Sequence, residues 1–149
     1  MDENDPISVV EHLMERCRDG EKGFREAAEK AKAADLKAFF NEVSTERAAF
    51  ARELQGALAT LGKPEKKESG SAEGALHRAW VNTKMALGGD DHTILDWLEQ
   101  GEDVAKDAYQ KALSGNLPAG LLDIVRRQGE SVMRVHNRVK TLRDAAKAA

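Results

Sequence analysis

Residues 19–28 read DGEKGFREAA, and residues 100–109 repeat the pattern as QGEDVAKDAY. Each copy contains a Gly-Glu pair, an aromatic residue and an alanine-rich stretch that favours helix. The two glutamates, Glu21 and Glu102, lie 81 residues apart, at positions that helical spacing assigns to an apolar face. A charge on an apolar face is costly unless another group compensates it. The repeat therefore predicts a duplicated helical unit. It also predicts that each of its two glutamates has a compensating partner.

The composition predicts one helical domain. The chain has 149 residues, of which only 5% are aromatic, and Ala, Glu, Lys and Leu dominate. The net charge of −3 argues against binding to nucleic acid or to an anionic membrane, which requires a basic surface. A single cysteine, Cys17, excludes an intramolecular disulfide. Because no apolar run is long enough to span a bilayer and signal-peptide features are absent, we expect a cytoplasmic protein of bacterial type.

The apolar spacing predicts an all-α chain with helices at about residues 7–33, 35–61, 72–87, 92–113 and 119–146. Short breaks make the first two helices one hairpin and the last two a second hairpin. The polar segment 62–71 and the helix after it are long enough to travel the length of a bundle. This favours a long crossover, in which helices 35–61 and 92–113 run parallel. An up-and-down bundle with a fifth helix docked on one end is the alternative.

Four segments resemble those of a known family: DGEKGFREAA (19–28), RAAFA (47–51), GSAEGALHRAW (70–80) and GEDVAKDAY (101–109). They are similar to an uncharacterised bacterial family, a domain of unknown function placed in the ferritin-like superfamily. The resemblance covers nearly the whole chain. It implies a ferritin-like four-helix bundle made of two pseudo-repeated hairpins with an extra crossover helix. It implies no activity, because the family has none established.

The inward-facing polar residues form a candidate metal site. Glu46 lies 25 residues after Glu21 in the first hairpin, and Gln128 lies 26 residues after Glu102 in the second. Each pair should therefore meet at one height in the bundle. Ferritin-like di-iron proteins place a Glu on each of two helices and Glu-x-x-His on each of the other two, and carboxylates suit iron or manganese. The candidate ligands are Glu21, Glu46, Glu102 and His136, with Glu53 and Gln128 as neighbours.

The same residues also depart from the di-iron pattern. Three positions after Glu46 stands Ala49, three positions after Gln128 stands Ser131, and Glu-x-x-His occurs nowhere in the chain. A single metal ion bound by three glutamates and a displaced ligand is one interpretation of this pattern.

The alternative is that the inward polar groups satisfy one another. A buried glutamate can stay protonated or pair with Arg47 or Gln128, although helical spacing lets Arg47 point outward. His136 would then form an ion pair with Glu53. On this interpretation, replacing Glu102 by Gln should be neutral or stabilising.

Three further features have structural explanations that we favour. Cys17 lies on the apolar stripe, which is typical of a buried, inert thiol. Glu73 and His77 share a helix face and could form half a metal site, but a docking face built around Trp80 is the simpler explanation. The Gly-Ser-x-x-Gly sequence at residues 70–74 indicates a helix start and not a phosphate loop, because no strand precedes it.

Two classes of function are compatible with these patterns. One is a non-catalytic helical bundle that acts through its surface or by forming a homo-oligomer. The other is an iron- or manganese-binding protein with an oxidase, peroxidase-like or storage activity. The missing Glu-x-x-His favours the first class, and the repeated inward glutamates favour the second.

Overall fold

The structure is a computed structural model that describes residues 5–62, 70–86 and 89–148. All regular structure in these ranges is helical, which confirms the all-α prediction. The helices are α1 (Pro6–Lys30), α2 (Ala34–Thr60), α3 (Ala72–Ala86), α4 (Asp91–Leu113) and α5 (Ala119–Ala148). None of the helices described is long and apolar enough to cross a membrane.

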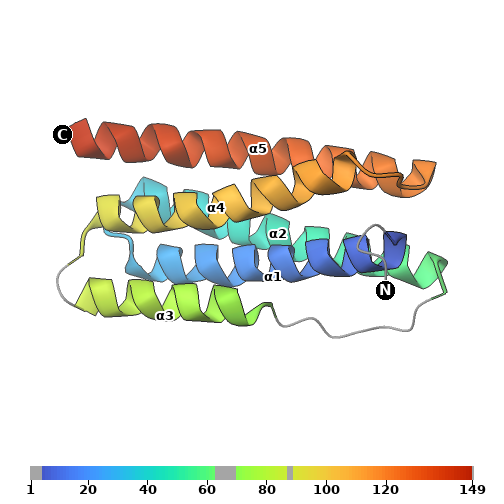
Figure 1. Cartoon of the computed structure of the whole chain (residues 1–149). Helices are drawn as coiled ribbons and strands as arrows, with labels where there is room; N and C mark the ends of the chain where they lie inside the picture. The colour runs from blue at the N-terminus through green and yellow to red at the C-terminus, as the bar shows by residue number, and fades with distance from the viewer. Residues whose placement is uncertain (1–4, 63–69, 87–88, 149) are drawn as a thin grey trace.

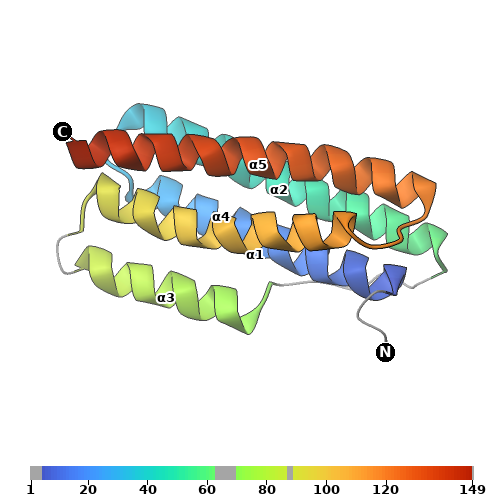
Figure 2. The ribbon, with the colours of Figure 1, turned by 45° about the horizontal axis from the view of Figure 1, so that its top comes forward.

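The four long helices lie side by side, and α3 lies outside them (Figure 1). α1 packs along α2, α4 packs along α5, and further contacts join α1 to α4 and α2 to α5. Within each sequential pair the helices run in opposite directions, whereas α2 and α4 run in the same direction (Figure 2). The chain therefore returns along the bundle between α2 and α4, and on this return α3 packs against α1 and α4.

An acidic side chain from α4 shapes the turn between α1 and α2. The backbone N–H groups of Lys32 and Ala33 donate to the Asp91 carboxylate, at 2.8 and 3.1 Å. Ala31 has extended backbone angles, so α1 ends at Lys30, before the expected end near residue 33. Asp35 lies inside the first turn of α2, which begins after Ala33 without a side-chain cap.

The core consists of two apolar clusters separated by a polar layer. One cluster contains Val10, Leu13, Leu54, Tyr109 and Val125 among others, and the second contains Phe24, Phe39, Phe40, Trp97 and Val139 among others. The buried polar and charged residues come from α2, α4 and α5; they are Ser44, Arg47, Glu102, Gln128, Ser131 and His136. Ser44, Arg47, Glu102 and His136 lie between the two clusters along their helices, whereas Gln128 and Ser131 lie between Val125 and Val132 of the first cluster. The buried polar side chains that could carry a function therefore lie in the middle of the bundle.

Candidate functional site

Arg47 compensates the buried glutamate of the second repeat. Its guanidinium donates two hydrogen bonds to Glu102, NH1 to Oε1 at 2.7 Å and NH2 to Oε2 at 2.6 Å. The two side chains are 1% and 2% exposed, so the expected outward position of Arg47 is wrong, whereas the possible pairing with an inward glutamate is confirmed. Gly20 makes room for this pair, because a Cβ atom there would lie 2.9 Å from Arg47 NH1.

The electrostatics of this pair favour the charged form of Arg47. Burial by itself lowers the pKa of Arg47, but the charge and hydrogen bonds of Glu102 outweigh burial and raise that pKa above its usual value. Arg47 also lies over the ring of Phe24, with 5.5 Å between the guanidinium carbon and the ring centroid. The pair is therefore a bidentate ion pair in the core, and it joins α2 to α4.

The glutamate of the first repeat is compensated within its own helix. Glu21 accepts from Arg18 at 2.7 Å and from Arg25 at 3.0 Å. Ser44 of α2 donates to the backbone carbonyl of Glu21 and not to its carboxylate. The negative charges of the two repeated glutamates are thus compensated in different ways, because Glu21 lies at the edge of the core and Glu102 lies inside it.

The remaining inward polar groups form a chain of hydrogen bonds. Gln128 accepts from the Tyr109 hydroxyl at 2.7 Å and donates to Glu53 Oε1 at 2.7 Å. Arg127 donates to the other oxygen of Glu53, and this bond lowers the Glu53 pKa, with a further contribution from Gln128. Ser131 donates to the Glu46 carboxylate. The predicted Glu53–His136 ion pair is wrong, because both residues have other partners.

The thiol of Cys17 lies at the end of this chain. Its Sγ atom lies 3.1 Å from the Tyr109 hydroxyl, and the residue is buried. Burial raises the pKa of the thiol to about 11, although the hydrogen bond between the thiol and Tyr109 opposes that rise. The thiol is therefore protonated at neutral pH, as expected for an inert core cysteine.

The four predicted metal ligands do not converge on one point in the structure. Glu21 contacts arginines of its own helix, Glu46 contacts Ser131, Glu102 contacts Arg47, and His136 contacts Asp103. In the part of the chain that the structure describes, one group of three carboxylate, imidazole or thiol ligands is close enough to hold a metal ion, and it contains only His136 of the four.

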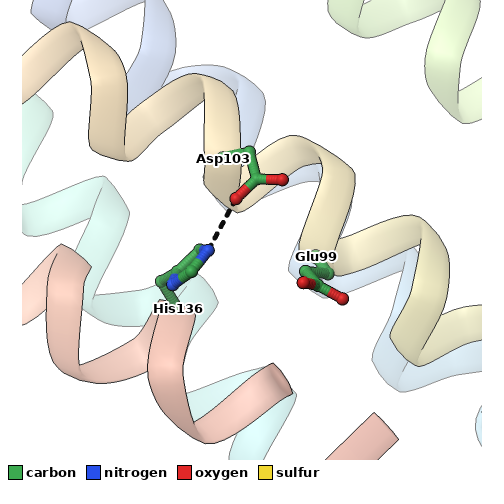
Figure 3. A group of neighbouring side chains, drawn as sticks. All are labelled: Glu99, Asp103 and His136. Carbon is green, nitrogen blue, oxygen red and sulfur yellow. Dashed lines mark hydrogen bonds and ion pairs between the residues drawn. The ribbon is translucent and has the colours of Figure 1, made fainter.

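That group consists of Glu99, Asp103 and His136 (Figure 3). Glu99 and Asp103 lie one turn apart on α4, and His136 faces them from α5. One ligand atom from each residue lies within 4.8 Å of the other two. His136 Nε2 is 2.6 Å from Asp103 Oδ1, and Arg143 of α5 forms an ion pair with Glu99. Neither acid was predicted as a ligand from the sequence. The pattern that could have indicated them is a pair of carboxylates four residues apart on one helix.

A cavity of about 450 Å³ lies between α1, α3 and α4. Four glycines contribute to its walls: Gly20, Gly23, Gly74 and Gly101. Gly101 is exposed where it lines the cavity, and a Cβ atom there would meet no other atom within 4 Å, so the space beside it is open. The side chains of Phe24, Trp97 and Leu98 make an apolar floor, Arg16 and Arg78 add positive charge, and the carboxylates of Asp19 and Glu102 also line the cavity.

Helix α3 forms one wall of this cavity and is held in place by two sets of contacts. The ring of His77 stacks on Trp97, with 5.0 Å between centroids, and the Trp97 indole N–H donates to the His77 carbonyl at 2.8 Å. At the start of α3, Asp19 accepts from the Ser71 backbone N–H at 2.8 Å and from its hydroxyl at 2.6 Å. The predicted helix start at residues 70–74 is confirmed. The side chains of Glu73 and Trp80 lie outside the described part of the chain, so their predicted roles stay predictions.

Comparison with known families identifies one match. The model of the Domain of unknown function (DUF2383) matches residues 5–115, well over half of the chain. The match spans α1 to α4 and includes the cavity, Arg47 and Glu102. A search of curated proteins finds no match to the chain.

Proposed function

We propose that this chain, which belongs to the DUF2383 family, is a ferritin-like helical bundle that acts by binding and not by catalysis. The ligand we propose is a small amphipathic anion that occupies the cavity beside α3. The observation that carries this proposal is the cavity itself, with its apolar floor, its glycine walls and two arginines at its edge.

The ferritin-like part of the proposal rests on topology and repetition. Two antiparallel pairs, α1–α2 and α4–α5, pack together, and the long return between α2 and α4 is typical of bundles with one crossover connection. The Gly-Glu repeat falls in α1 and α4, the first helix of each pair. This correspondence supports two related hairpins.

The size and lining of the cavity support a small ligand. Pockets for small molecules usually measure about 300–1,000 Å³ and combine apolar walls with a few polar groups. Arg16 and Arg78 both approach Asp19, with closest N–O distances of 3.5 and 3.7 Å. The buried NH1 atom of Arg78 donates no hydrogen bond to any described residue. A carboxylate or sulfonate beside Arg78 would supply an acceptor, while an apolar body lay against Trp97 and Leu98.

The titratable groups around the cavity support binding over catalysis. Asp19 accepts from Ser71, Glu102 is paired with Arg47, and His77 is hydrogen-bonded to the backbone carbonyl of Trp97. Each of these three side chains could act as a general base, but each already makes a contact that holds the helices together.

Iron or manganese binding at Glu21, Glu46, Glu102 and His136 stays a weaker candidate. An ion there would have to separate Glu102 from Arg47 in the core, leaving a buried guanidinium without its partner. Purified protein that carried stoichiometric iron or manganese, lost in Glu102→Ala, would favour it.

The proposal is tested with 1-anilinonaphthalene-8-sulfonate, a fluorescent probe with an apolar body and one negative charge. Gly101→Leu should fill the cavity and weaken probe binding by about tenfold or more, which corresponds to about 1.4 kcal/mol. Gly56→Leu is the matched control, because Gly56 is an exposed glycine in the interior of α2 where a Cβ atom meets nothing within 4 Å. Equal affinities of the two variants would overturn the proposal.

The anionic preference has its own test within this experiment. N-phenyl-1-naphthylamine has the same apolar body without the sulfonate. Arg78→Met should weaken binding of the sulfonate probe and leave binding of the neutral probe nearly unchanged. Equal losses for both probes would mean that Arg78 supports the shape of the cavity and not the recognition of charge.

A further inference from the structure

We propose that Glu99, Asp103 and His136 form a binding site for a divalent transition-metal ion, and that Arg143 occupies the place of the ion when no metal is bound. The site lies between α4 and α5 (Figure 3). None of its three residues lines the cavity beside α3. The proposal does not depend on the ligand proposed for that cavity.

The geometry needs only small side-chain movements to accept an ion. Ligand atoms that bind zinc at about 2.0–2.2 Å can lie at most about 4.4 Å from one another. The three ligand atoms here already lie within 4.8 Å of one another. His136 Nε2 and Asp103 Oδ1, now 2.6 Å apart, would separate slightly as the ion came between them. Because all three residues stand on regular helices, the backbone need not move.

The surroundings of His136 favour its role as a ligand. Its side chain is 9% exposed, and its Nδ1 atom lies 3.2 Å from Asn137 Oδ1. Nε2–H donates to Asp103 in the structure. When an ion takes the place of that hydrogen, a hydrogen bond from Nδ1–H to the Asn137 amide oxygen would hold the ring with Nε2 facing the ion, as outer partners do for histidine ligands in metal sites. Asp103 is 52% exposed and provides access from solvent.

Arg143 supplies the positive charge that an ion would replace. It contacts Glu99, Asp144 and, at 3.8 Å, Asp96. The ion pair between Arg143 and Glu99 involves the buried Oε2 atom of Glu99. Arg143 can therefore leave Glu99 and keep two acidic neighbours.

The ligand set determines the class of ion. One imidazole and two carboxylates suit zinc, cobalt or manganese, whereas magnesium and calcium prefer oxygen ligands alone. Two carboxylates and a neutral imidazole also balance the charge of a divalent ion. We therefore expect Zn²⁺ to bind and Mg²⁺ to fail to compete with it.

The test is isothermal titration of the full chain with Zn²⁺ in the presence of millimolar Mg²⁺, supported by the visible spectrum of the Co²⁺ form. One ion should bind per chain, and His136→Gln and Asp103→Asn should each weaken binding by more than about tenfold, the effect that even outer partners can have. The matched controls are His12→Gln and Asp107→Asn, which remove an exposed imidazole and an exposed carboxylate elsewhere. Circular dichroism without metal verifies that every variant is folded.

Arg143→Met distinguishes a metal site from two structural ion pairs. If Arg143 holds the place of the ion, its removal should tighten Zn²⁺ binding about tenfold or more even though an ion pair is lost. The proposal is overturned if the wild type and Arg143→Met both fail to bind Zn²⁺, or if His136→Gln binds it as tightly as His12→Gln does.

Discussion

The most consequential side chain in the core is an arginine. Apolar spacing on α2 identified Phe39, Phe40 and Phe50 as core residues, and all three are buried. It left Arg47 outside, because pattern reading assigns a charged residue to solvent unless a partner is known. The inward position of Glu102 was predictable from its own helix. Its partner stands 55 residues earlier on another helix, and only the assembled bundle, in which the Arg47 side chain reaches from α2 across the core to α4, identifies it.

Replacement of Glu102 by Gln should now be strongly destabilising and not neutral. The amide cannot neutralise Arg47, so a buried charge would lose its counter-charge, at a cost of about 3–5 kcal/mol in the free energy of unfolding. Urea denaturation at pH 7 measures this cost. The double variant Arg47→Met, Glu102→Leu should recover most of the loss, because it removes both charges. A single variant as stable as the wild type would contradict the ion pair.

Cys17 should make the stability of the protein depend on alkaline pH. Burial raises the thiol pKa to about 11, so the unfolded chain releases this proton at lower pH than the folded protein does. The thiol's contribution is complete below about pH 9 and is lost as the pH rises towards 11, by about 2–3 kcal/mol in total. Denaturation series between pH 8 and 11 should show a shallower decline for Cys17→Ala than for the wild type. Parallel curves would exclude this effect.

At the scale of elements, α3 depends on a residue of α1. The sequence predicted the start of α3 from Gly70, Ser71 and Gly74. Gly70 has a φ of 97°, which favours glycine, and the Ser71 hydroxyl accepts from the Gly74 N–H at 2.8 Å. The sequence placed Asp19 on the solvent side of α1, yet this residue binds Ser71. A cap supplied by another helix leaves no local signal, which is why pattern reading missed it.

Asp19→Ala should detach α3 while the four long helices persist. The loss of two hydrogen bonds at the start of a helix usually costs about 1–2 kcal/mol, which is large for an element that packs only on α1 and α4. Hydrogen exchange followed by mass spectrometry should show faster exchange in residues 72–86 and unchanged exchange in residues 34–60. Exposed Asp107, replaced by Ala, serves as the control. Uniform loss of protection in all helices would mean that α3 does not open independently.

At the scale of the whole molecule, the polar layer divides the core into two apolar halves. The sequence could predict the helices and the long return between α2 and α4, because both follow from apolar periodicity and linker length. It could not predict which polar groups meet, because small rotations of a helix decide whether Glu46 faces Gln128 or Ser131. The candidate metal group and the cavity depend on the same rotations. Both therefore became visible only when the helices were assembled.

The Arg47–Glu102 pair also limits the ways in which this chain can misassemble. The alanines on α1, α2 and α4 form smooth surfaces along which two helices could slide by one turn with little loss of apolar contact. Such a slide would displace Arg47 from Glu102 by about 5.4 Å and leave two opposite charges separated in a dry interior. Wrong alignments of α2 relative to α4 are thus penalised far more than wrong alignments of apolar side chains alone would be. The pair therefore selects a single register of the helices. This selection does not depend on how much the pair stabilises the correctly aligned bundle.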